Sequence, residues 1–256
     1  MPSKNLPGQN NSGSEDNPLL YCQDDGIGWV TFNRPQVLNA LDESLTAALV
    51  ERIQAIEFDT SVRCVVLSGN GPGFMSGGDI GFFGKTLKMT PQATRAAFHT
   101  FIHTAGFGMS LMMACDFVMA SQNSFFTMAY AHMALSPDGG SSFSLPRIVG
   151  TRKAMEMALL GDKLTSAQAL EYGLVNWVVE DEALTAETLK LAQRLAAGPT
   201  HAYGQTKQLI NNSFENTLAQ QLVAEEEAFA SCTATQDFPQ AAVAFLEKKK
   251  PTFQGC

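Results

Sequence analysis

An acidic residue, Asp138, lies between a proline and two glycines in the segment Pro137–Gly140, and the sequence on both sides is mostly apolar. Burial in such a loop would raise the pKa of the carboxyl group and make it a usable base, or leave it desolvated and nucleophilic. The simpler alternative is a turn aspartate that bonds to its own backbone, as Asp before Gly commonly does. Two glycine-rich segments elsewhere favour the chemical interpretation, so Asp138 is the candidate catalytic residue.

The two glycine-rich segments are Phe74–Ile80 and Ala105–Leu111. Each precedes a stretch with helical character, and glycines there let the backbone approach a ligand closely with N–H groups free to donate. Two such loops could each direct one N–H at the same oxygen and form an oxyanion hole. Taken singly, either could be only a tight turn. Neither matches a Walker loop or a GxGxxG motif.

Composition limits the class of protein that must position these loops. The chain has 256 residues, of which 45% are hydrophobic and 16% charged, enough for a large globular domain. A formal net charge of -8 argues against a nucleic-acid partner. The five cysteines lack metal-binding spacing, which predicts a reducing, cytoplasmic location and no metal. No apolar run could span a membrane.

The order of the expected elements predicts an α/β protein with a helical C-terminal region. Residues 1–17 are polar and lack signal-peptide features, so we expect a disordered tail. An α/β core is expected over residues 18–197 and a helical oligomerisation region over 198–256. Strands are expected near residues 28–33, 63–68, 125–129 and 174–179, and helices near 41–56, 90–103, 151–160, 165–172, 187–197, 201–232 and 238–249. Asp42 and Thr165 are the expected N-caps, and Gly198-Pro199 is the expected break.

These segments, in this order, resemble the crotonase superfamily of enoyl-CoA hydratases and isomerases. The matching segments are Asn33–Pro35, Leu38–Leu41, Phe74–Ile80, Gly106–Asp116, Ser136–Gly140, Leu145–Gly150, Ala169–Val175 and Pro251–Phe253. The resemblance implies a spiral of ββα units with a C-terminal helical trimerisation region, in a homotrimer or a dimer of trimers. It also implies an acyl-CoA thioester substrate, with coenzyme A as part of the substrate and no separate cofactor.

The resemblance also implies the site residues. The thioester oxygen would accept hydrogen bonds from the backbone N–H groups of Gly78 and Phe107, beside the acid Asp138. The residues implied to bind the CoA moiety or the rest of the substrate are Gln36, Val37, Leu38, Ser76, Asp79, Ile80 and Tyr130.

Two positions depart from the hydratase pattern. Hydratases of this family use two glutamates to activate water, whereas this chain has Ser110 and Tyr130 in those places. Asp138 stands where hydratases usually have a glycine, which is similar to isomerases that act on phenylacetate-type ring intermediates and to aryl-CoA dehalogenases. These departures put simple hydration in doubt.

The chemistry of one carboxylate distinguishes the remaining alternatives. An isomerase needs a single acid to move a proton beside an oxyanion hole. A dehalogenase uses the aspartate as a nucleophile and a histidine to activate water, and the helix with His99 and His103 resembles that pattern. We therefore predict an enoyl-CoA double-bond isomerase that uses Asp138 as acid and base. A hydratase, a dehalogenase-like enzyme and a non-catalytic acyl-CoA binder stay as alternatives.

A third departure concerns the length of one connection. Family members carry a β-strand and a glycine-containing turn between the helix that ends near His103 and the loop at Gly106, but here only Thr104 and Ala105 separate them. Loss of a strand would leave unpaired backbone groups in a parallel sheet. We therefore expect that residues are missing at this point and that no peptide bond joins Thr104 to Ala105.

Overall fold

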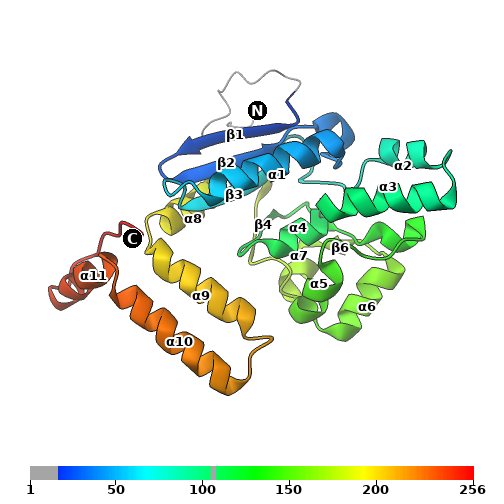
Figure 1. The fold of residues 1–256 in the computed structure, drawn as a ribbon. Coiled ribbons are helices and arrows are strands. Elements are labelled where there is room, and N and C mark those ends of the chain that lie inside the picture. The colour runs from blue at the N-terminus through cyan, green and yellow to red at the C-terminus, as the bar shows by residue number, and fades with distance from the viewer. Residues whose placement is uncertain (1–16, 105–107) are drawn as a thin grey trace. The chain divides into compact units, whose positions relative to one another are not determined.

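The structure, a computed structural model, describes residues 17–104 and 108–256 (Figure 1). Strands and helices alternate as far as residue 179, and only helices follow. The bounds of the first half are β1 Leu19–Asp24, β2 Ile27–Phe32, α1 Glu43–Glu57, β3 Cys64–Gly69, α2 Ile80–Thr86, α3 Pro91–Thr104 and α4 Gly108–Ala114. This order confirms the expected α/β core followed by helices. Most of the expected tail, the predicted break before Ala105 and the predicted donor Phe107 lie outside the described residues.

The strands of the second half are shorter than those of the first half. Its elements are β4 Met119–Ser121, β5 Phe125–Phe126, the 3-10 helix η2 Ala129–Met133, α5 Ser141–Val149, α6 Thr151–Leu160, β6 Leu164–Thr165, α7 Ser166–Glu171, β7 Trp177–Val179, α8 Leu184–Ala196, α9 Thr200–Asn212, α10 Leu218–Thr233 and α11 Asp237–Leu246.

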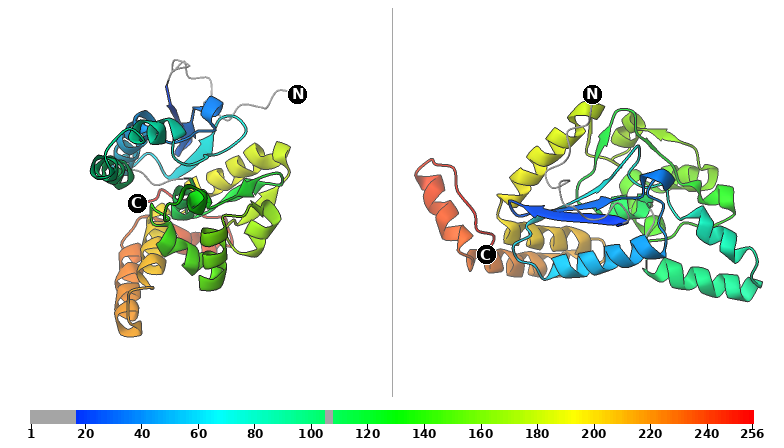
Figure 2. Two further views of the ribbon diagram at one scale, coloured as in Figure 1. Left: turned by 90° about the vertical axis from the view of Figure 1, so that its right-hand side faces the viewer. Right: turned by 90° about the horizontal axis from the view of Figure 1, so that it is seen from above.

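The first sheet has the strand order β1-β2-β3. β1 was not among the expected strands, and β2 is buried along its whole length. α1 runs alongside these strands in the views of Figures 1 and 2. Val30, Phe32, Leu41 and Leu45 form a buried cluster with Leu19 and Phe101. Asp42 caps α1 by accepting a hydrogen bond from Leu45 N at 2.9 Å, as expected.

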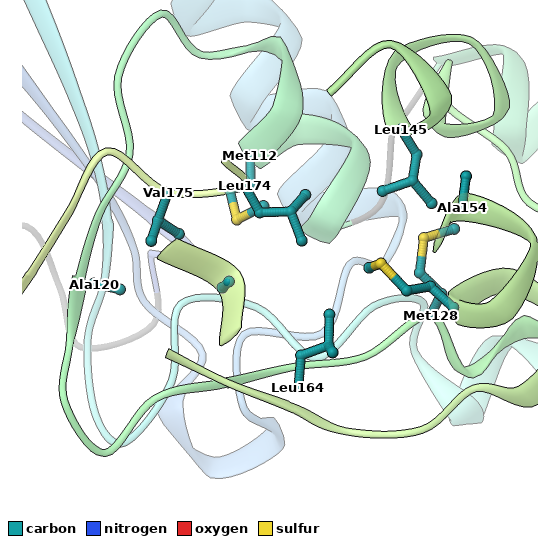
Figure 3. Packing of buried hydrophobic residues seen from close by; sticks show 10 residues of the cluster. Met112, Ala120, Met128, Leu145, Ala154, Leu164, Leu174 and Val175 are labelled. Carbon is teal, nitrogen blue, oxygen red and sulfur yellow. The ribbon is translucent and has the colours of Figure 1, made fainter. Parts of the chain in front are cut away.

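Two further sheets have two strands each. β4 pairs with β7 in parallel, and β5 pairs with β6 in antiparallel fashion. Around them, buried side chains from α4, α5, α6 and α7 pack together; Met112, Met128, Leu145 and Leu164 are among those drawn in Figure 3. Thr165 caps α7 in a capping box with Gln168, as expected.

No described strand joins the first sheet to the pair β4–β7. β3 bonds to β2, β4 bonds to β7, and β3 and β4 do not bond to each other. α3 ends at Thr104 and α4 begins at Gly108, so the connection that the family would supply with a strand is short here. Val65 on β3 is 39% exposed, although its apolar sequence is typical of a strand buried on both faces.

Chain contacts define two compact units, of which the second consists of residues 23–28, 60–65 and 190–256. Within it, α9 and α10 lie side by side (Figure 1). Arg63 donates to the carbonyl oxygens of Gly198 and Phe253, at 2.6 Å and 3.1 Å. The buried carboxylate of Asp237 accepts from the N–H groups of Gln254 and Gly255. These contacts fix the last residues against the helices.

The expectation of one helix over residues 201–232 is wrong. The structure has two helices, because the first ends at Asn212 and Thr217 starts the second. Thr217 accepts from Gln220 N, and the Gln220 side chain accepts from Thr217 N, which completes a capping box. The break at Gly198-Pro199 between α8 and α9 is confirmed.

Across the described residues, no helix has the length and apolar character needed to cross a bilayer.

Loss of the cap at Thr217 should weaken α10. We expect Thr217→Ala to lower the free energy of unfolding by about 1 kcal/mol, because the orphan N–H groups of the first turn lose their acceptor. Thr217→Ser keeps the hydroxyl and should stay within a few tenths of a kcal/mol of the parent protein. Urea denaturation followed by circular dichroism measures both, and equal losses in the two variants would contradict the role of the cap.

Candidate active site

The loop that carries Asp138 is held through its own backbone. The carbonyl oxygen of Asp138 accepts from Ser110 Oγ at 2.9 Å, from Ser141 Oγ at 2.7 Å and from Ser141 N at 2.9 Å. Ser110 and Ser141 are 4% and 0% exposed. Gly139 and Gly140 have φ of +56° and +83°, values that favour glycine and permit the tight entry into α5. Hydrogen bonds from α4 and from the start of α5 therefore hold the backbone of the loop.

The carboxylate of Asp138 is half-buried and faces one donor. Tyr130 OH donates to Asp138 Oδ1 at 2.8 Å. Burial raises the pKa of Asp138 to about 6, and the bond from Tyr130 opposes that rise by stabilising the charged form. Burial and the neighbouring Asp138 carboxylate raise the pKa of Tyr130 to about 12, so Tyr130 keeps its proton near neutral pH. A carboxyl group with such a pKa can take up and release a proton near neutral pH.

Ser110 and Tyr130, the residues in the two glutamate positions of hydratases, thus both bond to Asp138. Ser110 binds the backbone of the loop and Tyr130 binds the carboxylate. The sequence pointed to Ser110 only as a departure from a pattern, and to Tyr130 both as such a departure and as a substrate-binding residue. Ser141 was missed altogether, and its signal is slight: a serine directly after two glycines, at the start of a helix.

The glycine-rich loop before α2 adopts an extended path beside Leu41. Leu41 N donates to Gly77 O at 2.8 Å, and Asp79 N donates to Leu41 O at 2.9 Å. Gly78 lies between these two bonds, and its own N–H donates to no group of the described residues. Gly77 has φ of +112°, which again favours glycine. The backbone therefore presents one unused N–H at the position predicted for an oxyanion donor.

A buried polar network supports that loop from behind. Asn39, which is 0% exposed, accepts from Arg34 N and donates through Nδ2 to the carbonyl oxygens of Asn70 and Gly73, at 3.0 Å and 2.8 Å. Arg34 also forms ion pairs with Asp42 and Asp79, at 2.9 Å and 3.0 Å. The network ties the turn after β2 to the start of α1 and to the glycine loop.

Asp79 is occupied by this network. One of its oxygens pairs with Arg34, and the other accepts from Gly81 N at 2.7 Å and caps α2. Its side chain and its backbone N–H therefore both support the loop, and its contact with CoA stays a prediction.

The first turn of α4 connects the glycine loop with the Asp138 loop. A Cβ atom added to Gly108 would lie 3.1 Å from Met75 O, so the start of α4 is in close contact with the glycine loop. Two residues further on, Ser110 binds Asp138. α4 and α5 lie side by side at this point (Figure 1). The helix thus brings the free N–H of Gly78 and the carboxylate into one region of the same unit.

The other residues predicted to bind the substrate form an exposed strip. The 3-10 helix η1 spans Pro35–Val37. Val37, Leu38 and Ile80 are 38%, 48% and 78% exposed, and Gln36 and Ser76 are also exposed. Ser76 N donates to Leu38 O at 3.0 Å, so the two segments adjoin. Their exposure leaves them available to a ligand, but their roles stay predictions.

Among the described side chains, no histidine forms a hydrogen bond with Asp138, and no metal site is found beside the histidines. His132 Nε2 lies 3.2 Å from Leu160 O and does not reach Asp138. His99 lies on α3. Among residues 17–104 and 108–256, no group of three acidic, histidine or cysteine side chains could hold a metal ion.

Comparison with known proteins identifies the family. Two family models, both described as enoyl-CoA hydratase/isomerase, match residues 27–105 and residues 102–256. The chain is similar to the 1,2-epoxyphenylacetyl-CoA isomerase of Escherichia coli K12, with 33% identity over 93% of this chain and 98% of the relative. It is also similar to the mitochondrial enoyl-CoA hydratase of Pongo abelii, with 30% identity over 89% of this chain and 83% of that relative.

Solved structures that resemble this chain belong to the same family as the relatives found by sequence. The structure of an enoyl-CoA hydratase from Polaromonas sp. JS666 superposes with a TM-score of 0.84 at 30% identity, and the match covers 92% of this chain and 99% of that chain. The chain therefore belongs to the enoyl-CoA hydratase/isomerase family within the crotonase superfamily, and it is an acyl-CoA-processing enzyme of that family. The expected fold class is confirmed.

The comparisons also bear on the short connection after α3. The two family models meet at residues 102–105. The alignment with the Escherichia coli relative spans 259 residues although it includes 93% of the 256 residues of this chain, so that relative has residues without a counterpart here. The predicted absence of a peptide bond before Ala105 stays a prediction.

Removal of Asn39 should loosen the glycine loop. We expect Asn39→Ala to lower the free energy of unfolding by about 2–4 kcal/mol, because the fully buried Asn39 side chain is lost and two part-buried carbonyl oxygens lose their donors. Asn211→Ala, at an exposed position near the end of α9, is the matched control and should change the stability by less than about 0.5 kcal/mol. Chemical denaturation compares them, and equal effects would contradict the network.

The raised pKa of Asp138 should lower the free energy of unfolding near neutral pH. A carboxyl group whose pKa rises from 3.8 to about 6 on folding stabilises the folded state below its unfolded pKa and loses that contribution as the pH rises through about 6. We expect Asp138→Asn to be more stable than the parent at pH 7 by on the order of 1 kcal/mol, after allowance for solvent screening. The difference should shrink as the pH falls toward 4. Thermal unfolding across this range measures it, and a loss of stability at pH 7 would contradict the assignment.

Proposed function

We propose that this protein is an enoyl-CoA double-bond isomerase in which Asp138 is the acid and base. The observation that carries the proposal is that Ser110 and Tyr130 bond to Asp138 and supply no carboxylate of their own. Hydration needs groups that hold and deprotonate a water molecule, whereas a double-bond shift needs one group that removes and returns a proton. The site has one such group.

The reaction keeps its atoms in balance. The Asp138 carboxylate takes a proton from the carbon next to the thioester of a 3-enoyl-CoA, and the electron pair spreads into a dienolate whose negative charge lies on the thioester oxygen. The N–H of Gly78 would stabilise that charge, with Phe107 N as the second donor implied by the family pattern. The protonated Asp138 then returns the proton two carbons further along, which gives the 2-enoyl-CoA.

The names of two relatives support the choice of an isomerase. The Escherichia coli relative is named an isomerase of a CoA ester, and the trans-2-decenoyl-[acyl-carrier-protein] isomerase of Streptococcus mutans is 28% identical over 93% of this chain. For this chain we propose an acyl-CoA thioester as the substrate, no cofactor beyond the CoA moiety of that substrate, and a homotrimer or a dimer of trimers as the assembly.

Asp138→Asn should abolish the double-bond shift. We expect at least a 10³-fold loss of turnover of a 3-enoyl-CoA, because the amide cannot accept the proton, in line with the contribution of about 10²–10⁴ from general acid–base catalysis. Proton NMR in D₂O follows the vinyl signals and the entry of deuterium. Asp162→Asn, at an exposed aspartate, is the matched control and should retain full activity.

Two outcomes would overturn the proposal. Unchanged turnover by Asp138→Asn would mean that Asp138 supports the loop only. Formation of a 3-hydroxyacyl-CoA from a 2-enoyl-CoA by the parent protein, without any shift of a 3-enoyl-CoA, would assign the protein to the hydratases.

A further inference from the structure

The two oxygens of the Asp138 carboxylate have different surroundings. Oδ1 accepts from Tyr130 OH at 2.8 Å. Oδ2 accepts no hydrogen bond from any of the described residues. The carbonyl oxygen of the same residue is fixed by Ser110 and Ser141, so the side chain leaves the backbone from a fixed point. Within the described part of the chain, one oxygen of the carboxylate is therefore engaged and the other has no donor.

Tyr130 is suited to hold Oδ1 permanently. It lies on η2, eight residues before Asp138, and its ring packs against the buried cluster of α4, α5 and α6. Its raised pKa keeps the phenol protonated throughout the range in which Asp138 titrates. The phenol therefore remains a donor whether Asp138 is charged or neutral.

The other charged groups near the loop are directed elsewhere. α4 carries no charged residue, and α5 carries only Arg147. Arg147 lies over the ring of Phe143 at 3.5 Å and donates to Phe143 O. On η2, His132 contacts Leu160 O. Among the described residues, Tyr130 is thus the one titratable side chain that faces the carboxylate.

We propose that Tyr130 is a positioning residue whose hydroxyl holds Oδ1 of Asp138 and leaves Oδ2 as the single oxygen that exchanges the substrate proton. This rests on the proposed function, since it assigns a role within the same proton transfer. A fixed Oδ2 serves both half-reactions, because the same oxygen removes the proton and returns it along one face of the dienolate. Tyr130 acts through Asp138 and need not touch the substrate.

The pH profile of Tyr130→Phe tests the inference. Only the carboxylate form of Asp138 accepts a proton, so activity of the parent protein should fall below about pH 6. Loss of the phenol removes a donor that stabilises this charged form, and the acid limb of kcat/KM should move upward by about one pH unit. We also expect kcat to fall about tenfold or more while KM changes less than about twofold, because the geometry of proton transfer is lost and binding is not.

Two further variants separate the possible failures. Tyr21→Phe is the control: Tyr21 lies on β1, where its ring contacts Arg52, and loss of its hydroxyl should leave the pH profile of kcat/KM unchanged. Asp138→Asn measured in parallel tests the proposed function alone. If Asp138→Asn is inactive and Tyr130→Phe raises KM without moving the acid limb, Tyr130 contacts the substrate and the inference is wrong. If Asp138→Asn is active, or the parent protein shifts no double bond, the proposed function fails and the inference fails with it.

Discussion

Three hydrogen bonds converge on the carbonyl oxygen of Asp138, two from serine hydroxyls and one from the N–H of Ser141. A loop that contains two successive glycines with positive φ has little stiffness of its own, so these donors determine where the side chain starts. Because the backbone is satisfied internally, the carboxylate can lie half-buried without the loop moving out to water. Burial then raises its pKa toward neutrality, which is the property a base requires.

The second half of the site depends on a different constraint. The glycine loop runs beside Leu41 in an extended conformation. The Asn39 side chain donates to carbonyl oxygens near the loop, and Arg34 pairs with the carboxylate of Asp79. Among the described residues, no group accepts a hydrogen bond from the N–H of Gly78. Gly108 contacts the glycine loop and Ser110 bonds to the Asp138 loop, so the short helix α4 fixes the positions of the two loops relative to each other. Packing of buried side chains around α4 and α5 supports that arrangement.

The sequence predicted what depends on local patterns and on the family's motifs. The caps at Asp42 and Thr165 and the break at Gly198-Pro199 follow from the chemistry of single residues, and all three are present. The end of α9 was missed because Ser213–Asn216 carries no proline or glycine, and a capping box at Thr217 was needed to restart a helix. β1 was missed because Leu19–Asp24 directly follows the polar tail and ends in the polar residues Gln23 and Asp24.

The roles of individual site residues were harder to predict than the site itself. Motif matching located Asp138, Ser110 and Tyr130, but their mutual hydrogen bonds depend on how η2, α4 and α5 pack, which no local pattern encodes. Asp79 illustrates the reverse case. Its place in a family motif suggested contact with the substrate, whereas its carboxylate is engaged by Arg34 and by the first turn of α2.

The central claim is that a fixed, half-buried carboxylate in this loop has the pKa of a working base. The most direct test is a ¹³C NMR titration of the protein labelled at the side-chain carboxyl carbon of aspartate, with Asp138→Asn used to assign the signal. The account predicts that the Asp138 signal titrates with a pKa of about 6, well above the ordinary value of 3.8. A pKa at or below the ordinary value would show that the carboxylate is solvated, and would contradict its assignment as the acid and base of the site.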